Sequence, residues 1–117
     1  MGKITEDMVV CVYQTANEVY RGELSKSEGS IKVSSDSGMN MGSARDYITA
    51  FVNMMEGKAY TRTVNLFATE YYLECIGKDY GREAQRKAAQ ATLEHVEYYK
   101  SVHGYLAKAD KLARKYL

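Results

Sequence analysis

The chain has 117 residues, of which 45% are hydrophobic and 26% are charged, and its formal net charge at pH 7 is +1. This length supports one hydrophobic core without room for a second catalytic domain, so we expect one domain over residues 1–117. Cys11 and Cys75 are too few and too far apart for a disulfide framework or a zinc site, and they predict buried thiols in a reducing compartment, the cytoplasm. No apolar run reaches the roughly 18 residues of a membrane span, and the chain start lacks an apolar signal stretch, so no membrane partner is expected.

The first predicted helix covers about residues 5–21. Thr5 is a good N-cap residue, two acidic residues follow it at the positive end of the helix dipole, and Gly22 provides the stop. Apolar residues then recur at steps of three and four, which indicates one buried face: Met8, Val12, Ala16, Val19 and Tyr20.

Two further helices are predicted before Gly57. Ser25 and Glu28 have the spacing of a capping box, which favours a short helix that ends at Gly38, although serine and glycine are frequent in it. Ser43 and Asp46 suggest another cap, with an apolar stripe that continues to Gly57.

The second half of the chain predicts three more helices. One amphipathic run begins near Val64 and is closed by Gly77; the longest helix covers about 82–103; the last covers 105–116. Because the chain contains no proline and has glycine near each boundary, we predict an all-α fold, a single compact bundle of five or six helices with a helix-turn-helix-like unit at about 25–56.

The segment from about 25 to 56 has the order of a DNA-reading motif: a short helix, a glycine turn and a capped helix. Met39 is predicted to fill the core between the two helices. The exposed front of the second helix would then offer base contacts from Asn40, Ser43, Arg45 and Thr49. The alternative is an ordinary structural corner, because residues 25–57 carry three basic and four acidic side chains and phosphate binding depends on Lys and Arg.

Charge is distributed unevenly along the chain. Residues 1–57 contain five basic and eight acidic side chains, net −3, whereas residues 58–117 contain eleven basic and seven acidic ones, net +4. A basic connection with Lys58, Tyr60 and Arg62 is predicted to contact DNA phosphates. Further basic and aromatic residues extend this predicted face: Lys100, Tyr105, Lys108, Lys111, Arg114, Lys115 and Tyr116. The alternative is a solvated helix face with cations near the C-terminal end of the helix dipole.

Metal and catalytic patterns are weak. His95 and His103 lie eight residues apart on one predicted helix, about 12 Å along its axis, which is too far for one metal ion. Cys75 lies on an apolar stripe without a neighbouring histidine, and the turn at 77–81 lacks a phosphate-binding pattern. We therefore expect no enzyme activity, no catalytic residues, no metal and no cofactor.

Four stretches together resemble the N-terminal helical head domain of bacterial HNH endonucleases, including McrA-type modification-dependent restriction enzymes. These stretches are residues 39–48, residues 54–63, residues 68–74 with the sequence ATEYYLE, and residues 94–99 with the sequence EHVEYY. The resemblance implies an accessory module that engages double-stranded DNA or a nuclease domain or subunit, in bacterial restriction-modification and phage defence. The chain lacks the clustered His and Asn ligands of the nuclease itself, so an isolated head domain or a free-standing relative is expected.

A protein-interaction module is the competing interpretation: a helical unit that forms a homodimer or docks on a nuclease partner and regulates it. Methionine and tyrosine are frequent at adaptable interfaces, and the chain has six methionines and eleven tyrosines. The methionines expected on such an interface are Met39, Met41, Met54 and Met55.

Overall fold

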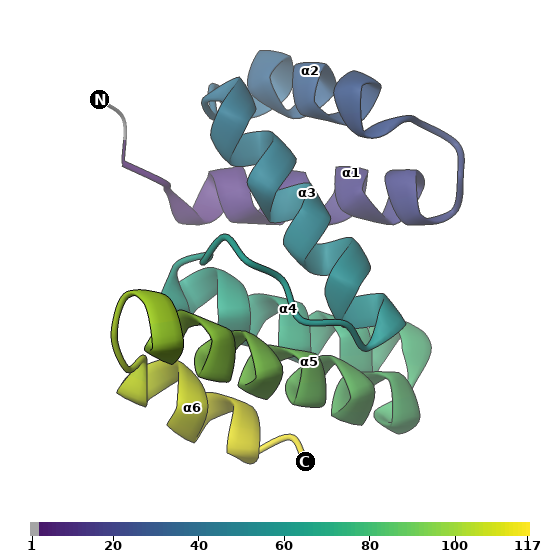
Figure 1. Cartoon of the computed structure of the whole chain (residues 1–117). Coiled ribbons are helices and arrows are strands. Elements are labelled where there is room, and N and C mark those ends of the chain that lie inside the picture. The colour runs from purple at the N-terminus through teal and green to yellow at the C-terminus, as the bar shows by residue number, and fades with distance from the viewer. Residues whose placement is uncertain (1–2) are drawn as a thin grey trace. The chain divides into compact units, whose positions relative to one another are not determined.

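A computed structural model describes residues 3–117. The first two residues, which belong to the predicted domain and to the chain start without a signal stretch, lie outside the described residues. The described residues form six α-helices and no strand (Figure 1), which confirms the predicted all-α fold. The helices are α1 (Glu6–Tyr20), α2 (Lys26–Ser37), α3 (Met41–Glu56), α4 (Leu66–Tyr80), α5 (Arg82–Val102) and α6 (Ala107–Arg114). Among them, none combines the length and the apolar character needed to cross a membrane.

The fold divides into two compact units between Val52 and Asn53. The first unit contains α1, α2 and most of α3, and the second contains the last residues of α3 together with α4, α5 and α6. A single domain over residues 1–117 stays a prediction.

The predicted starts of α1 and α2 are confirmed by their hydrogen bonds. The Thr5 hydroxyl accepts from the backbone N–H of Met8, and the Ser25 hydroxyl accepts from that of Glu28. The Glu28 carboxylate accepts from the Ser25 N–H at 2.8 Å, which completes a capping box. Serine side chains inside α2 bond back to carbonyls four residues earlier, such as Ser30 to Lys26 at 2.8 Å, so these hydroxyls have partners within the helix.

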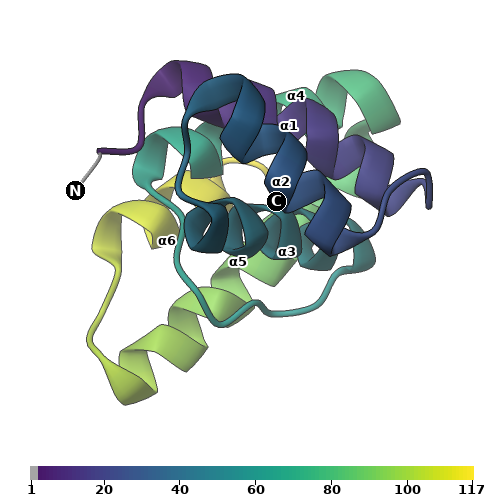
Figure 2. The same cartoon turned by 90° about the horizontal axis from the view of Figure 1, so that it is seen from above.

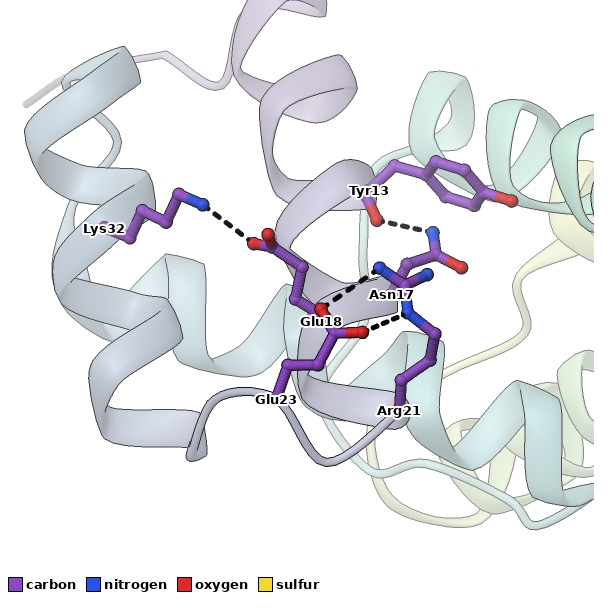
Figure 3. Close-up of polar contacts among 6 residues, drawn as sticks. All are labelled: Tyr13, Asn17, Glu18, Arg21, Glu23 and Lys32. Carbon is purple, nitrogen blue, oxygen red and sulfur yellow. Dashed lines mark hydrogen bonds and ion pairs between the residues drawn. The ribbon is translucent and has the colours of Figure 1, made fainter.

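In the first unit, α2 packs beside α1 (Figures 1 and 2). Gly29 permits the approach, because a Cβ atom at this position would lie 2.8 Å from Cγ2 of Val19 on α1 and 3.2 Å from Cδ1 of Ile48 on α3. At the surface, the Lys32 ammonium of α2 pairs with the Glu18 carboxylate of α1 at 2.9 Å (Figure 3).

The turn between α2 and α3 consists of residues 38–40. Gly38 has φ +80°, a left-handed conformation that glycine adopts at little cost, and its N–H donates to the Ser34 carbonyl. Met39 is completely buried, as predicted for the residue that fills the core beneath the turn.

The predicted start of α3 at Ser43 is wrong. The helix begins at Met41, and the Asn40 side-chain oxygen accepts from the backbone N–H groups of Gly42 at 2.9 Å and Ser43 at 3.3 Å. Asparagine is as good a cap as serine, and here it stands directly after the buried Met39, so the helix begins as soon as the turn is complete.

In the second unit, Gly81 alone links α4 to α5, and the two helices pack side by side (Figure 1). The predicted end of α4 at Gly77 is wrong, because the helix continues to Tyr80 and Gly81, with φ +99°, ends it. Gly77 instead makes room for Gln85, whose amide nitrogen donates to the Leu73 carbonyl at 3.1 Å.

The last helix, α6, packs against both α4 and α5 and is shorter than predicted. On α5, Val102 is exposed and Leu93 is half-buried, whereas Thr92 and His95 are buried. Both cysteines are half-buried thiols rather than the predicted buried ones.

We predict that Gly29→Val lowers the free energy of unfolding of the chain by about 2 kcal/mol, because the added side chain overlaps Val19. Urea unfolding followed by circular dichroism measures the change. Ser35→Val, on the exposed side of α2, is the control and is expected to change the same free energy by less than about 0.5 kcal/mol. Equal effects of the two substitutions would contradict a close approach at Gly29.

Candidate functional site

Two of the predicted base-reading residues lie on the same face of α3. Arg45 is exposed and Thr49, one turn later, is half-buried. The Arg45 guanidinium donates to the Ser27 hydroxyl of α2 at 3.3 Å, so it lies beside the N-terminal turns of both α2 and α3. The partner is a single exposed hydroxyl, which leaves most of the guanidinium donors accessible to a ligand.

The other two predicted base-reading residues are placed differently. The Asn40 side chain is exposed, but its oxygen caps α3, so the amide donors remain the part that could bind a base. Ser43 is half-buried and precedes Arg45 by two positions. Each residue of an α-helix turns by about 100°, so the two side chains are separated by about 200°, or roughly 160° when measured the shorter way around the helix. The structure thus brings Arg45 and Thr49 together and places Ser43 away from them.

The connection between α3 and α4 carries the predicted phosphate contacts. Lys58 and Arg62 are exposed, and the Lys58 ammonium lies 3.5 Å from the Glu56 carboxylate. Tyr60 is only 2% exposed, so its prediction as a DNA contact is wrong. Its hydroxyl donates to Thr92 at 3.4 Å, and burial raises its pKa to about 12.

The reason for the burial of Tyr60 is His95 on α5. The imidazole ring stacks on the Tyr60 ring, with centroids 4.2 Å apart, and Nδ1 bonds to the Tyr60 carbonyl. The Nε2 atom lies 2.8 Å from the Thr63 hydroxyl. With the hydrogen on Nδ1, the ring donates to the carbonyl and accepts from the hydroxyl, so one neutral imidazole fixes two points of the connection.

His95 is buried, and its pKa is lowered from the ordinary value of 6.5. Burial is the larger effect and lowers the pKa, whereas the hydrogen bond to the Tyr60 carbonyl raises it by less. The eight-residue spacing between His95 and His103 bears only on metal binding and does not predict this structural role. The signal for this role is the spacing of His95 from Ala88, Ala91 and Val96, which are buried neighbours on the same helix. In the described residues, no three His, Cys, Asp or Glu side chains are grouped so as to hold a metal ion.

The predicted basic face of the second unit is partly neutralised. Arg114 pairs with Asp110 at 2.5 Å, and the Tyr116 hydroxyl donates to the Glu74 carboxylate at 2.5 Å. Lys100 lies over the ring of Tyr105, with Nζ 5.8 Å from the ring centroid. The exposed basic residues of this face that form no ion pair with another described residue are Arg62, Lys108, Lys111 and Lys115, besides Lys100.

The methionines proposed for an interface are mostly in the interior. Met39 and Met54 are completely buried and Met55 is 6% exposed, so their placement on a surface is wrong. Met41 is half exposed and is the one member of this group available to a partner. Met54 and Met55 lie on the apolar stripe of α3, and Met39 lies in the turn before this helix, so all three are core side chains.

Comparison of the chain with family models, with curated proteins and with solved structures finds no match.

We predict that lowering the pH from 7.5 to 5 destabilises the wild-type chain through His95. The unfolded state, with the ordinary pKa of 6.5, binds the proton before the folded state does, so the stabilisation is complete above pH 6.5 and is lost as the pH falls through the lowered folded-state pKa. His95→Asn keeps a donor for the Tyr60 carbonyl but cannot titrate. This variant is expected to be less stable at pH 7.5 by about 1–3 kcal/mol and to show a smaller loss on acidification.

Thermal unfolding by circular dichroism at several pH values measures both effects. His103→Asn is the matched control, because His103 is exposed and at the end of the same helix, and it should keep the wild-type pH dependence. An unchanged pH dependence in His95→Asn, together with a reduced one in His103→Asn, would assign the effect to the other histidine.

Proposed function

We propose that the chain is a non-catalytic module that binds double-stranded DNA and positions it for an HNH-type restriction endonuclease. The observation that supports the proposal most is the succession of α2, the turn at 38–40 and α3. The turn at 38–40 contains glycine and is followed by α3, which is the order of elements in a helix-turn-helix, and Met39 within the turn is buried. In such a motif, the exposed face of the second helix, here α3, would enter the major groove.

Arg45 is the side chain proposed to read a base. Its guanidinium is exposed on the second turn of α3, and arginine can donate two hydrogen bonds to one guanine. Thr49 follows one turn later and supplies a hydroxyl and a methyl group on the same face. Asn40 contributes its amide donors at the start of the helix, whereas the position of Ser43 does not support a base contact.

Arg62 and Lys58 are proposed to bind phosphates. The second unit contains more basic than acidic residues, whereas the first contains more acidic than basic ones, so the charge of the second unit favours binding to a DNA backbone. Arg62 is exposed on a connection that His95 bonds at Tyr60 and Thr63, so little backbone entropy is lost when this side chain binds a phosphate.

The association with a nuclease, and the place of the module in cytoplasmic phage defence, rest on the resemblance of residues 39–48, 54–63, 68–74 and 94–99 to the head domain of these enzymes. Such a module would deliver DNA to a nuclease domain or subunit. Fluorescence anisotropy with labelled duplexes, unmodified and carrying modified cytosines, at low and moderate salt tests the DNA binding itself. Absence of salt-dependent binding to every duplex would contradict the proposal.

We predict that two arginine substitutions have different effects on DNA binding. Arg62→Ala should weaken binding to all duplexes alike and reduce the slope of log K against log salt by roughly 0.9, the value for one lost phosphate contact. Arg45→Ala should reduce the preference among duplexes by roughly tenfold, as expected for a lost bidentate base contact.

Two controls accompany this comparison. Arg45→Lys keeps the charge but not the planar pair of donors, so it should also lose the preference while retaining the salt slope. Lys78→Ala removes an exposed charge near the end of α4 and should leave both quantities unchanged. A preference that survives in Arg45→Ala would remove α3 from the base-reading role.

A further inference from the structure

The surface of the second unit contains a groove between the start of α4 and α6. Two adjoining hollows, each of about 330 Å³, form it and share Leu66 and Lys108 as lining residues. The first hollow is mainly apolar and is lined by Val64, Leu106 and Ala109 among others. The second is lined by Glu70, Leu112 and two further lysines. We call the two hollows together the α4–α6 groove.

The lysines of the groove lie along one side of α6. Lys108 and Lys111 lie on α6, and Lys115 is its C-cap residue with helical φ and ψ, so their spacing of three and four residues places them on one face over about 10 Å. All three are exposed, and no ion pair joins them to another described residue. Three aligned ammonium groups at the edge of an apolar hollow are complementary to a ligand with several negative charges spaced along its length.

The acidic residue of α6 does not compensate these lysines. The Asp110 carboxylate accepts from the Tyr105 hydroxyl at 2.6 Å and from the Arg114 guanidinium at 2.5 Å. These two bonds, with that to Tyr105 the larger effect, lower the pKa of Asp110, so it stays ionised and engaged at neutral pH. Asp110 therefore neutralises Arg114 and leaves the lysine face positive.

Contacts after the C-terminal end of α6 also fix the position of this helix, which forms one side of the groove. The Arg82 guanidinium of α5 donates to the Tyr116 carbonyl at 2.6 Å, and the Tyr116 hydroxyl donates to Glu74 of α4. The helix is thus fixed to both neighbours, so a ligand meets a preformed surface.

The apolar half of the groove distinguishes between the two polyanions that fit the lysines. Leu66 is 43% exposed at the junction of the hollows, and an aliphatic side chain of a ligand would cover it. A DNA backbone presents phosphates and sugars and gains little from an aliphatic pocket. An acidic amphipathic helix presents carboxylates at the same three- and four-residue spacing and apolar side chains beside them.

We propose that the α4–α6 groove binds an acidic amphipathic helix of a partner protein, with an aliphatic side chain in the apolar hollow and carboxylates on Lys108, Lys111 and Lys115. This binding goes beyond the proposed function, since the DNA contacts proposed above involve none of these residues. It gives the module a means of attachment to a protein that is separate from its DNA-binding residues.

The probe for this site is a fluorescein-labelled 15-residue peptide designed with leucine at every third or fourth position and glutamate beside each leucine. Binding to the whole chain is measured by fluorescence anisotropy. Two control peptides carry serine in place of leucine, or lysine in place of glutamate, and neither should bind. No binding of the acidic peptide, or equal binding of either control, would overturn the proposal.

Substitutions in the chain test whether the peptide binds in the α4–α6 groove. Leu66→Ser should weaken peptide binding about tenfold, as expected for loss of a central anchor contact, and Lys111→Ala roughly threefold. The double substitution Lys108→Glu with Lys111→Glu should abolish it. Lys78→Ala and Val102→Ser, both at exposed positions outside the groove, are the matched controls and should bind as the wild type does. Circular dichroism verifies that each variant is folded.

A DNA duplex provides the discriminating arm. Leu66→Ser and Lys111→Ala should bind it as the wild type does, whereas Arg62→Ala should keep full peptide binding. If the lysine variants lose DNA binding while the peptide never binds, the groove belongs to a DNA surface and the proposal is wrong. If the peptide binds and no duplex does, the groove proposal holds while the proposed DNA function fails.

Discussion

One buried imidazole determines the form of the second unit. The connection from Gly57 to Asn65 has no regular structure, and its own sequence offers few apolar groups to bury. His95 supplies the missing interactions, because its two ring nitrogens bond to the Tyr60 carbonyl and the Thr63 hydroxyl while its ring covers that of Tyr60. Asn65 then caps α4, whose first residue is Leu66, and the exposed Arg62 lies between the two bonded residues Tyr60 and Thr63.

These hydrogen bonds offset the desolvation penalty of the polar residues in the interior of the second unit. Every described buried side-chain nitrogen or oxygen atom has a hydrogen-bond partner, and Thr92 illustrates how: its hydroxyl donates to the Ala88 carbonyl and accepts from Tyr60. A buried group that loses its partner destabilises a protein by more than the bond itself contributes. The connection and α5 consequently stabilise each other.

Local chemistry made much of the fold predictable from the sequence. Thr5, Ser25 with Glu28, and Gly38 act through neighbours within four residues, and the structure confirms all of them. Gly77 could not be interpreted locally, because its role depends on Gln85 from the next helix. The start of α3 was missed for a related reason: two candidate caps lie three residues apart, and the burial of Met39 selects Asn40. The candidate site was predictable only for residues on a helical face, such as Arg45, whereas Tyr60 depends on a histidine 35 residues away.

Gly81 has a consequence for the order in which the second unit forms. A link of one residue holds the end of α4 beside the start of α5 at a minimal loss of chain entropy. Contacts between residues close in sequence form fastest, so we expect the α4–α5 pair to appear early in folding. The connection at 57–65 and α6 both bond to residues of this pair, so we expect them to dock after it has formed. The surfaces that carry Arg62 and the lysines of α6 are therefore among the last parts of the unit to assemble.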